Sequence, residues 1–212
     1  GAIVPVARDA EDLGDLQIIF ATTAGDVRRN RLSDFTNLRS NGKIAMKLPE
    51  GVELVGARIC SEDDDVMLVT DSGRAIRFQT TDVRVFNSRA STGVRGIRLT
   101  GLDRVVSMSV IRHFKATPEE RVAYLKMRRA MAGLTDEDAG AEDDTPAATD
   151  FSQERYAEMS ASENLILTIT KGGAGKLSSS HDYPIRGRGG MGVTAMDKAM
   201  RGGAVITSFP VE

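Results

Sequence analysis

A unit of about fifty residues that occurs three times constrains this chain more than any other sequence feature. Aligning the chain with itself places Gly25 over Gly73, 48 positions apart, and Gly73 over Gly172, 99 positions apart. The second offset is close to two periods, so an insertion separates the second unit from the third. A repeat of this length is typical of propeller-type arrays, in which each unit buries its apolar face against its neighbours. We therefore expect an all-β array.

Each unit predicts the same succession of elements. An apolar strand meets a tight turn that contains glycine, and a second strand with basic residues follows, which is a hairpin signal. An irregular, basic connection then leads to a short strand, a turn and a closing strand. We expect the strands at residues 18–22, 27–32 and 54–57, then 66–70, 75–80, 94–99 and 105–108, and finally 165–169, 176–180 and 205–211.

These strands predict the following division of the chain. We expect the closing strand of an upstream blade at 1–6, one blade at 7–60, and further blades at 61–111 and 164–211.

Residues 112–163 interrupt this pattern. The sequence Thr-Pro-Glu-Glu at 117–120 combines a capping box with a proline at the first helical position, and Gly133 is placed to end the helix. Residues 135–149 are acidic and contain no aromatic residue, which is typical of a disordered linker. A second short helix is expected at 151–159. The insertion is therefore predicted to be a helical hairpin with an acidic linker.

The overall charge hides two regions of opposite sign. The chain has 212 residues and a net charge of −2, but residues 113–163 hold 6 basic and 12 acidic residues, which leaves the repeats with 22 basic and 18 acidic residues. Such asymmetry favours a polyanionic partner for the repeats. The single cysteine excludes an internal disulfide and favours a reducing compartment, and no apolar run is long enough for a membrane span. We expect a cytoplasmic, nucleoid-associated protein.

Residues suited to catalysis or metal binding are not found at the required spacings. The glycine-rich segment 171–176 lacks the first glycine of a phosphate loop, and Leu177 stands where a serine or threonine would bind magnesium. Segment 187–192 has the spacing of a dinucleotide fingerprint, but the repeat already explains its glycines. His113 and His181 have no cysteine or carboxylate at ligand spacing. We therefore predict no catalytic residue, no metal site and no cofactor in this fragment.

Basic residues recur with the repeat, and they are the candidate binding residues. If each unit presents cations at the same place, the edges of the units join into one positive path that matches the charge spacing of a duplex. Few aromatic residues occur in the loops, which disfavours stacking on single strands. Arg84 is a further basic residue of these loops, outside the predicted set. The predicted DNA-binding residues are Arg28, Arg29, Arg31, Arg39, Lys43, Lys47, Arg74, Arg77, Arg89, Arg95, Arg98, Lys176, Arg186 and Arg188.

Several consecutive motifs resemble a known family. They are Ala-Thr-x-x-Gly-x-Val-Arg-Arg at 21–29, Leu-x-x-Phe-x-x-Leu-Arg at 32–39, Gly-Lys-Ile-Ala-Met-Lys-Leu at 42–48 and Thr-Gly-Val-Arg-Gly-Ile-Arg-Leu at 92–99. Together they resemble the C-terminal DNA-wrapping domain of the DNA gyrase A subunit, over residues 2–110 and 164–211.

The resemblance implies a β-pinwheel, a propeller-like array of four-stranded blades that exchange a strand between neighbours. Here it would hold about three blades and an α-helical hairpin insertion. It implies that duplex DNA wraps around the basic rim and is presented for ATP-dependent negative supercoiling. The implied partners are double-stranded DNA and the remainder of the gyrase A subunit, together with the gyrase B subunit, in an A2B2 holoenzyme. ATP and magnesium would serve the holoenzyme, since the cleavage tyrosine and the ATPase lie elsewhere.

Two alternatives remain open from the sequence. The equivalent domain of topoisomerase IV shares the blades, and a protein-interaction propeller would not bind DNA at all. The family's signature box, Gln-Arg-Arg-Gly-Gly-Lys-Gly, has its nearest relative at 186–192, where Met191 replaces the lysine. For the insertion we consider a protein partner, another gyrase segment, or competition of its acidic linker with DNA for the basic rim.

Overall fold

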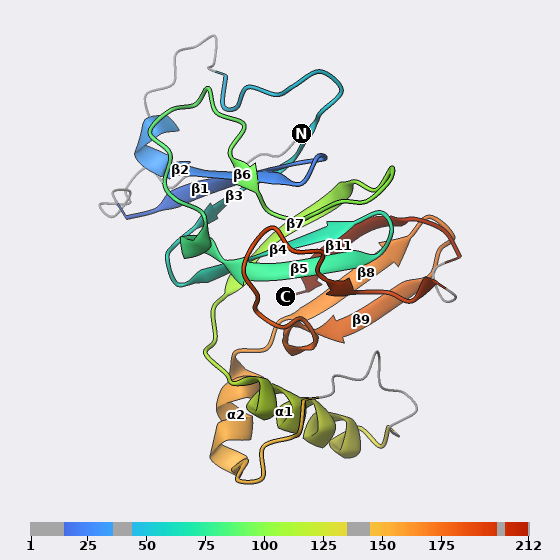
Figure 1. Cartoon of the computed structure of the whole chain (residues 1–212). Helices are drawn as coiled ribbons and strands as arrows, with labels where there is room; N and C mark the ends of the chain where they lie inside the picture. Colours follow the sequence, from blue (N-terminus) through green and yellow to red (C-terminus); the bar gives the residue numbers. More distant parts are fainter. Residues whose placement is uncertain (1–14, 36–43, 135–144, 199–201, 212) are drawn as a thin grey trace.

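The computed structural model describes residues 15–35, 44–134, 145–198 and 202–211. Within these ranges it shows three antiparallel sheets in a row and a pair of helices beyond them (Figure 1). The first sheet has the strand order β3-β1-β2-β6. Its strands are β1 (Gln17–Thr22), β2 (Asp26–Arg31), β3 (Leu54–Cys60) and β6 (Val94–Arg95).

The second and third sheets follow the same plan. The second has the order β10-β5-β4-β7, with β4 (Asp64–Thr70), β5 (Arg74–Gln79), β7 (Val105–Arg112) and β10 (Val193–Thr194). The third has the order β11-β8-β9, with β8 (Leu165–Thr170), β9 (Gly175–Ser179) and β11 (Val205–Val211). Each second strand leads into a short 3-10 turn: η1 (Leu32–Phe35), η2 (Thr80–Asp82) and η4 (Ser180–Asp182).

Neighbouring repeats exchange a strand, as the family resemblance implies. β6 belongs to the second repeat but pairs with β2 of the first, where Val94 lies opposite Val27. β10 of the third repeat pairs in the same way with β5 of the second. Among the described residues the third sheet has three strands, so the four-stranded blade is seen twice.

One expected strand is much shorter than predicted. The sequence predicts a strand over residues 94–99, and the structure has only the two residues of β6. The backbone turns inward after β6, because the N–H groups of Gly96 and Ile97 both donate to the carbonyl of Gly25, at 2.8 and 3.2 Å. Ile97 is thereby buried in the core.

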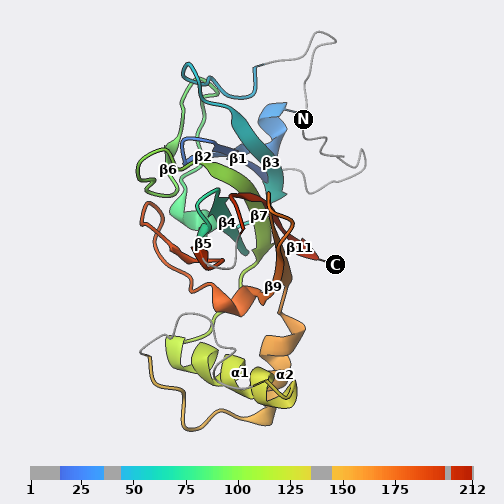
Figure 2. The ribbon, with the colours of Figure 1, turned by 90° about the vertical axis from the view of Figure 1, so that its right-hand side faces the viewer.

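Both faces of the second sheet are buried. Successive side chains of its strand β4 point to opposite faces of the sheet. Val66 and Leu68 of β4 pack toward the first sheet, in a cluster that also contains Ile19. Met67 and Val69 pack toward the third sheet, in a cluster that also contains Ile166. The second sheet therefore lies between the other two (Figure 2), with one hydrophobic cluster on each of its faces.

Two glycines permit the close approach of the exchanged connections. A Cβ on Gly93 would lie 2.1 Å from the carbonyl oxygen of Val27, and one on Gly192 would lie 2.2 Å from that of Ala75. Both have positive φ angles, 95° and 69°, which favour glycine. The backbone of each connection can therefore lie directly on the second strand of the preceding blade.

We expect Gly192→Ala to separate β10 from β5 and to lower the free energy of unfolding by about 1–3 kcal/mol, since the added methyl group meets backbone and the φ angle is strained. Urea unfolding followed by circular dichroism measures this. Gly187→Ala in the same connection is the matched control, because a Cβ there meets nothing within 4 Å. Equal midpoints for the two variants would contradict the prediction.

The predicted helical hairpin is present, as α1 (Pro118–Met131) and α2 (Gln153–Ala161). The capping box forms: the N–H of Glu120 donates to the Thr117 hydroxyl at 3.2 Å, and the N–H of Thr117 donates to the Glu120 carboxylate at 2.8 Å. Tyr124, Leu125 and Met159 form a small core between the helices. Neither α1 nor α2, the helices of the described ranges, has the length and apolarity of a membrane span.

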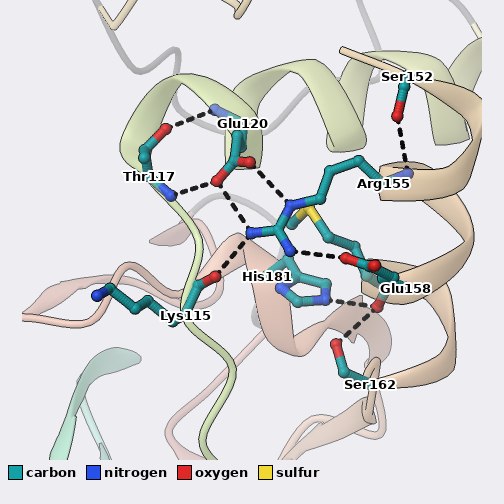
Figure 3. A network of polar contacts seen from close by, with 9 residues as sticks. Lys115, Thr117, Glu120, Ser152, Arg155, Glu158, Ser162 and His181 are labelled. Carbon is teal, nitrogen blue, oxygen red and sulfur yellow. Dashed lines mark hydrogen bonds and ion pairs between the residues drawn. The ribbon is translucent and has the colours of Figure 1, made fainter.

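Polar contacts fix the two helices to each other. The Arg155 guanidinium donates to the carboxylates of Glu120 and Glu158 and to the carbonyl of Lys115, each at 2.8 Å (Figure 3). These contacts lower the pKa of Glu120 and raise that of Arg155. The hairpin is thus held closed at the start of α1, where the chain leaves β7.

His181 attaches the hairpin to the third sheet. His181 is buried in η4, and its Nε2 donates to the Met159 carbonyl at 3.0 Å. Its ring lies edge-on to the ring of Tyr124, with 4.9 Å between the centroids. Burial lowers the pKa of His181 below its usual 6.5; the charge of Arg77 acts in the same direction, and the Met159 carbonyl, Glu163 and Asp182 oppose it. The folded protein therefore favours the neutral ring.

Folding stability should consequently fall in mildly acidic solution. The unfolded chain takes up a proton at His181 near pH 6.5, whereas the folded chain takes it up only at a lower pH. The contribution of His181 to folding stability is therefore fully present above pH 6.5 and is lost as the pH falls toward the folded-state pKa. Urea midpoints of the wild type and His181→Gln at pH 7.5 and 5.5 measure this. The variant should lose less stability between the two values, and equal losses would contradict the role of His181.

Candidate nucleic-acid interface

The connections that follow the second strand of each repeat lie side by side on one edge of the array. This edge is the side of the first two sheets that carries β6 and β10, opposite β3 and β7. The later two connections are stacked on the left-hand side of Figure 2. We call the loop edge the described parts of these connections, namely residues 44–48, 84–98 and 184–194.

Hydrogen bonds join the three connections. The Arg28 guanidinium donates to the carbonyls of Arg89 and Ser91, each at 2.8 Å, and also to that of Ala45, which links the first connection to the second. The N–H of Arg98 donates to the Gly190 carbonyl at 2.8 Å, which links the second to the third. The loop edge is thus one continuous surface that runs across the repeats.

A second set of contacts strengthens the link between the second and third connections. Arg188 donates from Nε to the Asp82 carbonyl at 2.9 Å and from Nη1 to the Arg95 carbonyl at 3.1 Å. The N–H of Gly189 donates to the carbonyl of Gly96. The segment that the sequence singled out as nearest to the family's signature box therefore lies directly against the preceding connection.

The charged side chains of the loop edge are all positive. Its three segments contain no aspartate or glutamate. Arg95 of β6 lies opposite Asp26 of β2. Burial raises the pKa of the Asp26 carboxyl group, and the charge of Arg95 opposes that effect. The exposed cations of the loop edge are Lys47, Arg84, Arg95, Arg98, Arg186 and Arg188, and Arg89 is half-buried. A surface of this kind attracts polyanions.

Other predicted residues lie elsewhere. Arg31 and Lys176 are exposed on β2 and β9. The ammonium of Lys176 donates to the carbonyl of Ala195 at 3.1 Å. Arg74 is half-buried and donates to the carbonyls of Met191 and Gly192, at 2.7 and 2.6 Å. Arg39 and Lys43 lie outside the described residues.

Three of the predicted residues are buried, with exposed fractions of 0% for Arg28, 4% for Arg29 and 4% for Arg77. Arg29 donates from Nε to the Val83 carbonyl at 2.7 Å and from Nη1 to Gln17 at 2.8 Å. These side chains hold the second strand of a blade against the connection of the next repeat. In this structure their donors therefore face acceptors of the protein itself.

Arg77 takes in the second blade the position that Arg29 has in the first, and it has a charged partner. Its Nε and Nη2 contact the Asp65 carboxylate at 2.8 and 2.7 Å, and its Nη1 donates to the Ser180 carbonyl at 2.8 Å. Asp65 also contacts Nδ1 of His113 at 2.9 Å. Burial lowers the pKa of Arg77, and Asp65 opposes that effect. The 48-residue offset relates Asp65 to Gln17, so the two blades use the same positions.

A family model described as "DNA gyrase C-terminal domain, beta-propeller" matches residues 17–61, 64–112 and 164–211. The three matched segments are the three repeats, and the helical hairpin lies between the second and the third.

Curated relatives match along nearly the whole chain. Over 99% of this chain, it is 46% identical to the DNA gyrase A subunit of Granulibacter bethesdensis and 41% identical to that of Rickettsia bellii. The chain spans about a quarter of the length of these relatives, 24% and 23%.

Among solved structures, the E. coli ParC C-terminal domain aligns with a TM-score of 0.56 and 17% identity, over 93% of this chain and 63% of that one. At this identity the likeness shows the fold alone.

Proposed function

The chain belongs to the DNA gyrase C-terminal domain, beta-propeller family, and from that membership we propose that its loop edge binds the phosphate backbone of duplex DNA. One observation carries the proposal: in three successive connections joined by hydrogen bonds, every charged side chain of the loop edge is an arginine or a lysine. A duplex presents a regular series of phosphates, and each one neutralised by an arginine or lysine releases counterions, which favours binding.

The residue types of the loop edge suit phosphate contacts in particular. Arginine forms charge-assisted, bidentate hydrogen bonds with phosphate oxygens. Gly187, between Arg186 and Arg188, has no atom within 4 Å of the place of a Cβ, so a phosphate can approach the backbone closely there. Contacts of this kind fix the position of a duplex without reading its sequence. We infer that binding is largely independent of base sequence.

The succession of repeats leads to a further part of the proposal, that the duplex bends. A duplex that contacts the connections of successive blades must follow the rim of the array, and its bending costs on the order of 1–6 kcal/mol for a site of 20–30 base pairs. Each additional blade adds phosphate contacts that offset this cost. The proposed role is therefore DNA bending or wrapping.

The role of the wider enzyme is proposed from the family, because the chain spans about a quarter of its relatives. Within gyrase, the wrapped segment would be presented for ATP-dependent negative supercoiling by the B subunit together with the remainder of the A subunit in an A2B2 assembly. ATP and magnesium would act there, and this chain would contribute binding rather than catalysis. We propose a cytoplasmic, nucleoid-associated location. The equivalent domain of topoisomerase IV is the alternative within type II topoisomerases.

Binding of the chain to a fluorescent duplex of about 40 base pairs, measured by anisotropy at increasing salt, tests the proposal. If five to seven cations each neutralise a phosphate, the slope of log K against log salt should be about −4.5 to −6.3. Absence of binding at low salt, or binding that does not change with salt, would contradict it and favour a propeller that binds proteins.

A further inference from the structure

A cavity of about 300 Å³ lies between the helical hairpin and the third repeat. Its lining joins the start of α1, which contributes Thr117 and Arg121, to the segment from His181 to Arg186. Three arginines, Arg77, Arg121 and Arg186, line it, and none of its described lining residues is an aspartate or glutamate. An apolar wall is provided in part by Phe114. We call this cavity the hairpin groove.

The arginines of the hairpin groove differ in what they contact. Arg77 is buried and its charge is balanced by Asp65 at 2.7 Å, so it has a structural role. Arg121 of α1 is half-buried, and its Nη1 donates to the His181 carbonyl over a long 3.4 Å. Arg186 is exposed, and within the part of the chain that the structure describes its side chain has no hydrogen bond or ion pair. Two cations from separate elements thus face one cavity.

The described helices add no carboxylate to the lining of the groove. Glu120 of α1 accepts a hydrogen bond of 2.8 Å from Arg155 of α2 (Figure 3) and does not line the groove. The acidic balance of the insertion comes from residues 136–150, which hold seven acidic residues and no basic one, whereas α1 carries four basic and two acidic residues. The described hairpin is therefore not an acidic surface.

The groove is continuous with the loop edge. Arg186 belongs to both, and the neighbouring Arg188 contacts the carbonyl of Arg95. A duplex that follows the loop edge across the first two sheets would therefore reach the start of α1. The groove has room for a phosphate group and several waters, since a water occupies about 30 Å³ of liquid.

We propose that the helical hairpin extends the DNA path, with Arg121 and Arg186 holding one phosphodiester of the duplex at the hairpin groove. This inference rests on the proposed function of the loop edge. The family match omits residues 113–163, so the contact would belong to chains that carry such a hairpin. On this proposal the hairpin binds DNA directly, and it is neither a passive spacer nor a docking site for a protein partner.

The test compares duplex binding by four single variants, one of which, Arg98→Gln on the loop edge, reports on the proposed function alone. Arg121→Gln should weaken binding about eightfold at 0.1 M salt and make the log–log salt slope shallower by about 0.9, the effect of one phosphate contact. Arg121→Lys keeps the charge and should keep the wild-type slope. Lys126→Gln is the matched control, because Lys126 is exposed on the same helix and does not line the groove.

The outcomes separate this inference from the proposed function. If Arg98→Gln on the loop edge weakens binding while Arg121→Gln and Lys126→Gln both match the wild type, the inference is wrong and the loop edge still binds DNA. If the wild type does not bind the duplex, the proposed function itself fails. Should Arg121→Gln lose helical circular dichroism, the slope of Arg121→Lys decides: a wild-type slope supports the inference, and a slope shallower by about 0.9 counts against a charge contact.

Discussion

Replacing Arg95 and Arg98 together by glutamine should weaken duplex binding about 60-fold at 0.1 M salt. Each phosphate contact contributes about 0.9 to the slope of log K against log salt, which corresponds to about eightfold per contact at this concentration. The salt slope should become shallower by about 1.8 for the same reason. Both side chains are exposed on the central connection of the loop edge, so their loss leaves the packing of the blades intact.

The matched control removes two exposed arginines from the opposite edge. Arg58 lies on β3 and Arg112 at the end of β7, the outer strands on the far side of the first and second sheets. Their double replacement by glutamine gives the same net charge as the test variant. It should change binding by less than about threefold, since only long-range attraction is reduced. Equal losses in the two variants would mean that net charge, and not the loop edge, governs binding.

Arg77→Met should lower the free energy of unfolding by about 3–5 kcal/mol, the usual cost of removing one partner of a buried ion pair. The substitution leaves the Asp65 carboxylate buried, with a hydrogen bond to the His113 ring as its remaining side-chain contact of those described above. It also removes the hydrogen bond to the Ser180 carbonyl, which joins β5 to the third repeat. Urea unfolding measures the loss.

A double variant identifies the cause of that loss. Arg77→Met with Asp65→Asn removes the uncompensated charge but keeps a hydrogen-bond acceptor for His113, so it should be more stable than Arg77→Met alone. A double variant as unstable as the single one would show that the lost carbonyl contact dominates. A single variant as stable as the wild type would contradict the structural role assigned to Arg77.

The repeat and its local signals predicted most of the fold. Glycine turns placed the hairpins of each blade within one or two residues of the observed strands. The capping box at Thr117 placed the start of α1, because its two hydrogen bonds depend only on residues three positions apart. The exchanged strand was implied by the resemblance and not by any local pattern, since it pairs residues such as Val27 and Val94 that are far apart in the chain.

The roles of individual arginines could not be read from the sequence. Adjacent residues of a strand point to opposite faces, so Arg28 and Arg29 should not both be buried in a blade with one solvated face. Both are buried because the connection of the next repeat covers the outer side of β2 and offers carbonyls to their guanidinium groups. A sequence pattern cannot show this cover, and whether any residue of the predicted set binds DNA stays a prediction.

A tethered cleavage reagent tests the position of the duplex most directly. Single cysteines would be introduced at Met191 on the loop edge, 45% exposed, and at Leu54 on the opposite edge, 40% exposed, and each would be labelled with iron–EDTA. The native Cys60 should not compete for the label, because it is buried and burial raises its pKa to about 12. We expect cleavage of a bound duplex from position 191 and none from position 54. Cleavage from position 54 alone, or equally from both positions, would contradict the proposal that the duplex lies on the loop edge.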